Sequence, residues 1–324
     1  MHNYAIYRNY RLSLFLILST LLFGCTKEAG SRNTVYQKLQ VNGQLTAPVQ
    51  DIFKILQLNN PSNNSSSLRY NPVTTIAAAN LLAQTNLLRD EKSERWHTQT
   101  ATETRDLMQA NITKLVADLQ KLGLIDIVEP TQKHYRYALV MGATFSTVSK
   151  RLGYLVQLIK TGYSFDTVVL LGSERPLKPE ELEQLANLQS SPQVINQNID
   201  LNNIKTEAQV MEFAYKFNPD LQTQAKLTIN ASMVQKPDRA LARANTDDTI
   251  LTFAKQAPQT GSCLVISNNP YVLRQTLVVK RLLDQNKFPT DGAGAAVSES
   301  NKSDIIMLMD EFARTLYEEN KIKN

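Results

Sequence analysis

The sequence predicts an α/β fold, in which a parallel β-sheet carries helices on both faces and follows an all-helical N-terminal region. From about residue 135 onward, short apolar runs alternate with longer stretches of helical periodicity. This alternation is typical of parallel strands joined by helices. The runs are apolar throughout instead of alternating with polar residues, which indicates strands buried on both faces.

The composition excludes several other classes of protein. The chain has 324 residues, of which 42% are hydrophobic and 20% charged, so it is not wholly disordered. Two cysteines are too few for a disulfide scaffold. The formal charge is +5, but no dense Lys/Arg stripe with interleaved aromatic residues is present, so no nucleic-acid partner is expected.

The first residues have the features of a targeting segment. Arg8 and Arg11 precede an apolar run from Leu12 to Phe23, which is shorter than the about 20 residues needed to span a bilayer. A basic flank before such a run is typical of a signal peptide. The following Gly24-Cys25 resembles the bacterial lipoprotein box, in which the cysteine is acylated. The alternative is a buried helix with an incidental cysteine.

These features predict a lipoprotein signal peptide over residues 1–24 and lipidation of Cys25. Such a protein is anchored in the membrane of the bacterial cell envelope and faces the periplasm. Thr26 follows the cysteine, which in lipoproteins implies sorting to the outer membrane. Loss of the signal peptide removes two arginines and no acid, and lowers the formal charge to +3. Cys263 then remains as a lone thiol, so no internal disulfide is expected.

Periodicity divides the rest of the chain into three parts. The polar residues 25–45 are predicted to be a tether. Apolar residues at helical spacing predict a helical region over residues 46–130, with Gly123 stopping its last helix. Residues 131–324 are predicted to form the α/β domain, with a final helix, residues 305–318, packed on its outside. We interpret Gly292-Ala293-Gly294-Ala295 as a loop, because it lacks a strand-to-helix context.

Small and polar residues follow the predicted strands. In an open parallel sheet, ligands bind beyond the carboxyl ends of the strands, where helix N-termini favour anions. The residues expected to converge there are Gly142, Thr144, Gly172, Ser173, Arg175, Ser267, Asn268 and Asn269. The alternative is that they are ordinary turn residues, since turns use the same amino acids.

Several of these residues belong to motifs that occur in a fixed order. They are Leu139-Val140-Met141-Gly142-Ala143, Arg151, Leu171-Gly172-Ser173, Thr206-Glu207-Ala208, Asn245-Thr246-Asp247-Asp248 and Ser267-Asn268 with Arg274. In order and spacing, residues 135–317 resemble the YdcF/SanA/ElyC-type bacterial family of unknown function. Four positions depart from that family: Tyr271 stands where a His is usual, Asp248 where a Glu is usual, Thr249 where an Asn is usual and Gln275 where a small residue is usual.

The resemblance implies a Rossmann-like domain associated with the cell envelope. It suggests S-adenosylmethionine or another nucleotide-like ligand, whereas no reaction is established for the family. If the usual His were a catalytic base, Tyr271 would leave this chain without it. No metal is expected, because His97 and His134 are far apart and lack metal-ligand spacing. The nucleophile and phosphate-loop motifs G-x-S-x-G and G-x-x-x-x-G-K are also absent.

Individual side chains have two interpretations each. Arg151 and Arg274 are either clamps on a phosphate or carboxylate, or solvated helix arginines. Glu207 and Asp248 either handle a proton or stabilise the first turn of a helix. Asn245 is expected to cap its helix. The complete set of expected ligand-binding residues is Gly142, Thr144, Arg151, Gly172, Ser173, Asn245, Thr246, Ser267, Asn268 and Arg274.

Two functions are therefore carried forward. The first is an envelope-associated lipoprotein that binds an anionic or nucleotide-like small molecule, with or without catalysis, in cell-envelope biogenesis. The alternative is a non-enzymatic envelope scaffold with a degenerate pocket. The sequence indicates no particular protein partner.

Overall fold

A computed structural model of the chain describes residues 38–58, 72–87, 102–191, 194–195, 200–224, 227–230, 244–256 and 258–322. These residues belong to one compact unit. The signal peptide and Cys25 lie outside the described residues, so both stay predictions.

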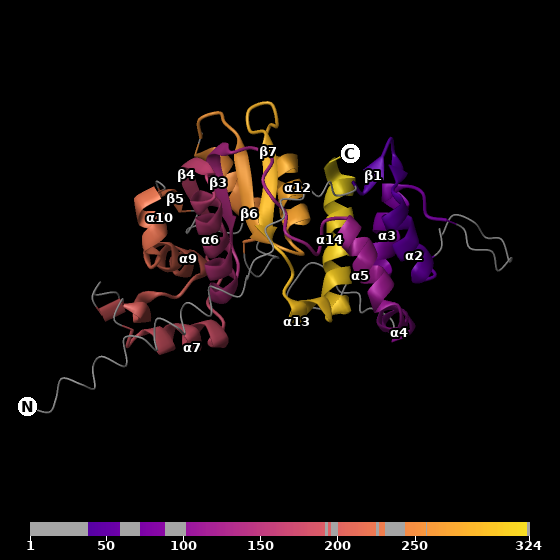
Figure 1. Cartoon of the computed structure of the whole chain (residues 1–324), viewed down its shortest axis with the longest axis horizontal. Helices are drawn as coiled ribbons and strands as arrows, with labels where there is room; N and C mark the ends of the chain where they lie inside the picture. The colour runs from indigo at the N-terminus through magenta and orange to yellow at the C-terminus, as the bar shows by residue number, and fades with distance from the viewer. Residues whose placement is uncertain are drawn as a thin grey trace, which may run out of the picture. The chain divides into compact units, whose positions relative to one another are not determined.

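The predicted α/β fold is confirmed, with a Rossmann-like sheet. Its five strands have the order β5-β4-β3-β6-β7, and all neighbouring strands are parallel (Figure 1). The strands are β3 (His134–Met141), β4 (Ser164–Leu171), β5 (Leu227–Asn230), β6 (Cys263–Asn268) and β7 (Thr290–Ala295). The chain proceeds from β3 to β4 and β5 on one side, and then to β6 and β7 on the other. The strand order thus reverses between β3 and β6, where open α/β sheets bind ligands.

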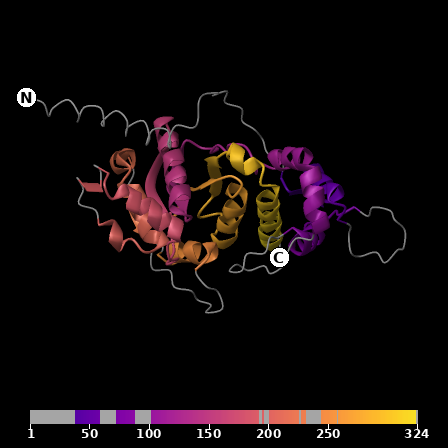
Figure 2. The same cartoon turned by 90° about the horizontal axis from the view of Figure 1, so that it is seen from below.

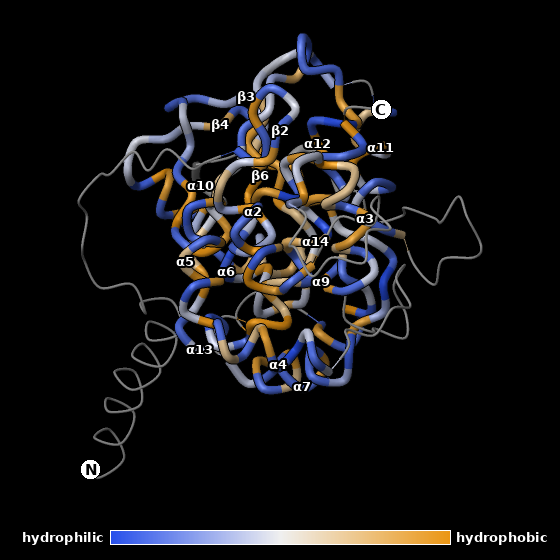
Figure 3. The backbone as a smooth tube through the Cα atoms, turned by 90° about the vertical axis from the view of Figure 1, so that its right-hand side faces the viewer, coloured by the Kyte–Doolittle hydropathy of each residue, from blue (hydrophilic) through white to orange (hydrophobic). Residues whose placement is uncertain are grey.

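The central strands β3, β4 and β6 are buried on both faces, as their apolar sequences predict. On β3, Ala138 and Val140 belong to a core shared with α6 and α9, whereas Leu139 and Met141 belong to a core shared with α11 and α12. β6 is correspondingly hydrophobic in Figure 3. The helices concerned are α6 (Phe145–Lys160), α9 (Glu207–Lys216), α11 (Thr246–Lys255) and α12 (Val272–Leu282). The domain also contains α7 (Pro179–Leu188), the 3-10 helix η1 (Leu201–Asn203), α10 (Pro219–Gln224) and α13 (Glu299–Lys302).

The loop predicted around Gly292 is wrong, because these residues form the edge strand β7. The strand has few apolar side chains because α12 lies directly on it. A Cβ atom at Gly292 would lie 2.1 Å from Thr276 Oγ1, and one at Gly294 would lie 2.6 Å from both Ser267 O and Val272 Cγ2. Glycine here permits close packing of a helix on a strand.

The N-terminal region contains four described helices. They are α2 (Ala47–Ile55), α3 (Ile76–Asn86), α4 (Thr102–Ala110) and α5 (Ile112–Lys121). Gly123, at a φ of 77°, follows the last of them as predicted. Residues 59–71 and 88–101 lie outside the described part, so the all-helical character of the whole region stays a prediction.

The predicted tether ends earlier than expected, because residues 38–45 pack onto the molecule. β1 (Gln40–Val41) and β2 (Gln44–Leu45) form an antiparallel hairpin around Asn42-Gly43. Both turn residues have positive φ, as a two-residue hairpin turn requires. Leu39 and Leu45 are buried in the core of the helical region.

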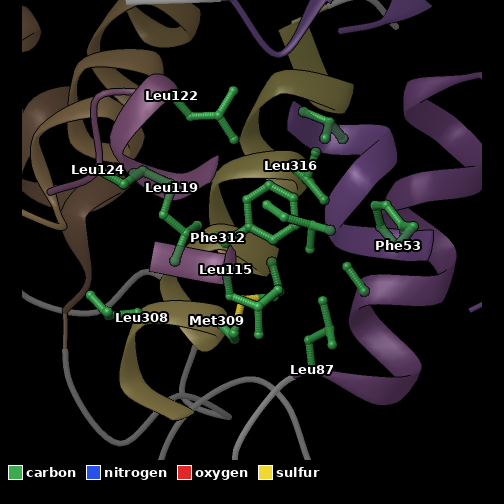
Figure 4. Close-up of a cluster of buried hydrophobic side chains, with 14 of the residues drawn as sticks. Phe53, Leu87, Leu115, Leu119, Leu122, Leu124, Leu308, Met309, Phe312 and Leu316 are labelled. Atoms are coloured by element: carbon green, nitrogen blue, oxygen red, sulfur yellow. The ribbon is translucent and has the colours of Figure 1, made fainter. Parts of the chain in front are cut away.

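The prediction that the final helix packs on the outside is also wrong. α14 (Ile305–Ile322) lies between α12 and the N-terminal helices in both Figure 1 and Figure 2. Its residues Phe312 and Leu316 meet Phe53 and Leu115 in one hydrophobic core (Figure 4). This core crosses the boundary predicted at residue 130, so the helical region and the α/β domain share α14.

Candidate functional site

A pocket of about 440 Å³ opens at the carboxyl ends of β3 and β4. Its wall includes the turn from β3 to α6, the residues after β4, and the first turn of α11. One face of α12 and part of α14 complete it. The pocket therefore lies at the reversal of strand order, where the fold predicts ligand binding.

The structure brings most of the predicted site residues together. Those that line the pocket are Gly142, Thr144, Arg151, Ser173, Glu207, Asn245, Thr246 and Arg274. They come from five separate segments of the chain, so their convergence is a property of the fold. Their roles in binding or catalysis stay predictions. Arg175, which the sequence placed on the same rim, also lines the pocket.

Four predicted site residues lie behind the wall instead. Gly172 serves packing: a Cβ atom there would lie 2.6 Å from Ala208 Cα, at the start of α9. Ser267 donates a hydrogen bond to Gln275 Oε1, and Asn268 Oδ1 accepts one from Arg151 Nε at 2.9 Å. Ser267 and Asn268 therefore position pocket residues without lining the pocket themselves.

Asp248, predicted to handle a proton, is the fourth. Its Oδ2 accepts a hydrogen bond from the amide of Asn245 at 2.8 Å. In return, Asn245 Oδ1 accepts from the amides of Asp247 at 2.7 Å and Asp248 at 3.3 Å. This reciprocal cap occupies Asp248 at the start of α11, so the structure does not place its carboxylate in the pocket.

Arg151 is the most buried cation in this set, with 2% of its surface exposed. Its Nε donates to Asn268 Oδ1, and its Nη1 donates to Met141 O at 2.7 Å and to Gly142 O at 2.9 Å. Nη2 has no hydrogen-bond partner in the described part of the chain. Burial lowers the pKa of Arg151 to about 10, although it stays charged at neutral pH.

Arg274 lies on α12 and is paired differently. Its Nε donates to Oε1 of the buried Glu311 on α14. Burial alone would lower the pKa of Arg274, but attraction to Glu311 and Glu318 outweighs burial and raises it. Nη1 and Nη2 of Arg274 have no hydrogen-bond partner among the residues that the structure describes.

Glu207, Arg175 and Glu181 form a buried network beside the pocket. Glu207 Oε2 accepts from the Ser173 amide at 3.0 Å and from Ser173 Oγ at 2.6 Å. Arg175 joins Glu207 Oε1 at 3.4 Å and holds Glu181 through two bonds of 2.7 and 3.1 Å. Glu207 therefore holds the start of the β4–α7 loop in place, and Arg175 shapes the rest of this loop.

At Gly142 the backbone of the β3–α6 turn packs directly against β4 and Glu207. A Cβ atom there would lie 2.7 Å from Leu171 O and 3.0 Å from the Glu207 carboxyl group. Only glycine lets the β3–α6 turn lie this close to β4 and Glu207. The residue therefore lines the pocket through its backbone.

Sequence reasoning missed the contribution of α14. Arg314, Tyr317 and Glu318 line the pocket, as does Asp247 from α11. Arg281 on α12 joins the two carboxylates: its Nη2 lies 2.8 Å from Asp247 Oδ2, and its Nε lies 3.0 Å from Glu318 Oε2. No local pattern marks α14 as a pocket wall, because its place depends on tertiary packing.

Other kinds of site find no support in the described residues. They contain no cluster of His, Cys, Asp and Glu residues that could hold a metal ion. Within the same ranges, no helix is long and apolar enough to cross a membrane. Cys263 is buried, and burial raises the pKa of its thiol to about 12, so it is not a reactive nucleophile.

Comparison with known proteins does not decide the function. No protein-family model, curated protein or solved structure matches the chain.

Proposed function

We propose that the pocket binds a small molecule through a phosphate-like anionic group held by Arg151. The buried state of Arg151 is the observation that carries this proposal. Its hydrogen-bond acceptors are two backbone carbonyls and a neutral amide, and no carboxylate in the described ranges forms an ion pair with it. Glu207 and Glu311 attract Arg151 only from beyond ion-pair distance. A buried cation without a direct counter-ion is costly, and a bound anion would supply one.

The start of α6 supports the same location for the anion. The side chain of Thr144 does not cap this helix, and Glu181 takes only the amide of Phe145, at 2.9 Å. The next two amides, of Ser146 and Thr147, have no hydrogen-bond partner among the described residues. Thr147 lines the pocket. Free amides at a helix N-terminus attract anions and can donate to them.

The charge of the lining points the same way. Five cations line the pocket, namely Arg151, Arg175, Lys178, Arg274 and Arg314, together with three acids, Glu207, Asp247 and Glu318. Arg175, Arg274 and Arg314 are paired with Glu181, Glu311 and Asp310 behind the wall. The positive charge left to attract an anion is therefore that of Arg151 and Lys178. Binding of this kind does not require catalysis, and Glu207 is already engaged by Ser173 and Arg175.

Isothermal titration with inorganic phosphate and a panel of nucleotides tests this function. We expect Arg151→Met to weaken the binding of any phosphate-bearing ligand by about tenfold or more, because a charge-assisted hydrogen bond contributes about 1.5–3 kcal/mol. Arg136→Met is the matched control, since Arg136 lies on β3 outside the pocket and bonds to Thr260 O and Gln259. Unchanged affinity in Arg151→Met would contradict the proposal and favour the scaffold alternative.

We further propose that the protein acts at the bacterial cell envelope, anchored through a lipid on Cys25. The basic flank and short apolar run before Cys25 support this, as does the resemblance to an envelope-associated family. Cys25→Ser should move the protein from the membrane fraction to the soluble fraction. Cys263→Ala is the matched control and should leave it with the membrane. A Cys25→Ser protein that still sediments with membranes would contradict the anchor.

A further inference from the structure

Two helices begin at the pocket, and their first turns differ. The amides of Ser146 and Thr147 on α6 have no hydrogen-bond partner within the described ranges. At the start of α11, by contrast, Asn245 Oδ1 accepts from the amides of Asp247 and Asp248. The cap therefore leaves this helix start unsuited to an anion. Its first turn brings Thr246 and the acidic Asp247 into the pocket instead.

Asp247 forms a fixed pair of acceptors with Glu318. Arg281 binds Oδ2 of Asp247 at 2.8 Å and Oε2 of Glu318 at 3.0 Å, which holds the two carboxylates in place from behind. Oδ1 of Asp247 has no partner among the described residues. An ionised carboxylate only accepts hydrogen bonds, so this part of the pocket requires a donor from the ligand.

Gln275 adds a buried donor to the same pocket. Only 5% of its surface is exposed, and its Oε1 accepts from Ser267 Oγ. Its Nε2 has no partner in the part of the chain that the structure describes, although the side chain lines the pocket. Gln275 follows Arg274 on α12, and both side chains line the pocket. This amide group is therefore open to the pocket, where it can donate to an acceptor on the ligand.

Thr246 adds a third polar group beside the acceptor Asp247 and the donor Gln275. Its hydroxyl also has no partner among the described residues. A hydroxyl can both donate and accept a hydrogen bond. A phosphate group only accepts hydrogen bonds and an ammonium group only donates them. A hydroxyl group does both, so it satisfies Asp247, Gln275 and Thr246 together. Arg281, which pairs with both Asp247 and Glu318, and Lys321, which pairs with Glu318, together balance the two acids, so no further cation is needed from the ligand.

We propose that the ligand is a phosphorylated sugar or polyol, with its phosphate at Arg151 and its hydroxyl groups at Asp247, Gln275 and Thr246. This assignment rests on the proposed function and deepens it. It divides the pocket into a cationic end, formed by Arg151 and α6, and a hydroxyl-binding end, formed by α11 and α12.

Titration of the full chain in mild detergent with inorganic phosphate, ribose 5-phosphate and ribose tests the assignment. We expect ribose 5-phosphate to bind about tenfold or more tightly than inorganic phosphate, because its hydroxyls add hydrogen bonds to a charged acceptor. Ribose alone should bind more weakly than ribose 5-phosphate, since it lacks the group that pairs with Arg151.

Variants show which residues bind the hydroxyl groups of ribose 5-phosphate. Asp247→Asn replaces an acceptor by an amide of the same shape, and Thr246→Val removes a hydroxyl; each should lower the advantage of ribose 5-phosphate over phosphate by about tenfold. Asp284→Asn is the matched control, because Asp284 lies just beyond α12, outside the pocket. In Asp284→Asn, the ratio of the affinities for ribose 5-phosphate and phosphate should equal that of the wild type.

The outcomes separate the two proposals. Equal binding of phosphate and ribose 5-phosphate would overturn the hydroxyl assignment and leave the anion site intact. If both Asp247→Asn and Thr246→Val still bind ribose 5-phosphate more tightly than phosphate by the wild-type factor, the assignment of the hydroxyl groups to these residues is wrong. Absence of binding by both phosphate compounds would overturn the proposed function and this inference together.

Discussion

Replacement of Arg175 by methionine should strongly destabilise the protein, because two buried carboxylates depend on this guanidinium. It binds both carboxylate oxygens of Glu181, at 2.7 and 3.1 Å, and one oxygen of Glu207, at 3.4 Å. All three residues are buried. Methionine fills similar space and carries no charge, so it would leave Glu181 and Glu207 buried without their cation.

The expected magnitude follows from the geometry. Removal of one partner from a buried ion pair costs about 3–5 kcal/mol. Glu181 accounts for the larger share because its contact is short and bidentate. Glu207 retains its two hydrogen bonds from Ser173 and loses only a long contact. We therefore expect a loss of about 4 kcal/mol in the free energy of unfolding at pH 7, a large part of the typical 5–15 kcal/mol.

The loss should depend on pH. Burial acts to raise the pKa of Glu181, but hydrogen bonds from Arg175 and from the amides of Lys178 and Phe145 outweigh it and hold this pKa below its usual value. A lowered pKa adds stability above the unfolded value of about 4.3, and this stability is lost as the pH falls through the lowered pKa. Without Arg175 the buried carboxylate favours its protonated form, so the deficit of the variant should shrink between pH 7 and pH 5.

Urea unfolding followed by circular dichroism at pH 7 and pH 5 measures both effects. The double variant Arg175→Met/Glu181→Gln should recover part of the stability at pH 7, because a neutral amide is less costly to bury than an unpaired charge. Arg136→Met, which removes an arginine with no buried acid partner, should lose less than about 1 kcal/mol. A loss below about 1 kcal/mol in Arg175→Met, or one that is the same at both pH values, would refute the reasoning.

Three further predictions follow from the packing and capping. Gly172→Ala should lower the free energy of unfolding by about 1–3 kcal/mol in calorimetry, because its Cβ would lie 2.6 Å from Ala208 Cα; wild-type stability would contradict this. Asn245→Ala should cost about 1 kcal/mol by loss of the cap, whereas Asn245→Asp should cost little; equal losses would argue against capping. In Cys25→Ser, the buried Cys263 thiol should resist Ellman's reagent at pH 8 until the protein is denatured; rapid labelling of the native protein would disprove its burial.

The parallel sheet could be predicted because its central strands carry their own signal. The apolar runs of β3, β4 and β6 are buried on both faces, so they are readable without knowledge of their neighbours. β7 could not be read in this way. Its Gly292 and Gly294 are required by the close approach of α12, and a glycine that serves tertiary packing looks the same in sequence as one that serves a loop.

The pocket was predictable where strands end and unpredictable where distant helices close it. Gly142, Thr144 and Ser173 follow from the rule that parallel strands place their carboxyl ends at one edge. Glu318 and Arg314 do not, because the position of α14 depends on contacts with both α12 and the N-terminal helices.

The two acids at the start of α11 show that sequence alone can assign the wrong role to one of two adjacent residues. Asp247 faces the pocket and Asp248 caps the helix, although they are adjacent and chemically identical. The available signal was the spacing of Asn245 and Asp248, which fits a reciprocal cap. That spacing would have assigned Asp248 to the cap and left Asp247 for the ligand.

The position of α14 governs when the helical region can become stable. α2, α3 and α5 have 9, 11 and 10 residues, and isolated helices shorter than about 12–15 residues are marginal in water. Their shared core is completed only by α14, and Gln40 Nε2 bonds to Glu319 Oε1 across 279 positions of sequence. Such distant pairings slow folding. The N-terminal helices therefore become stable only after residues 305–322 have been synthesised. The helical region and the pocket wall formed by α14 then fold together in one late step.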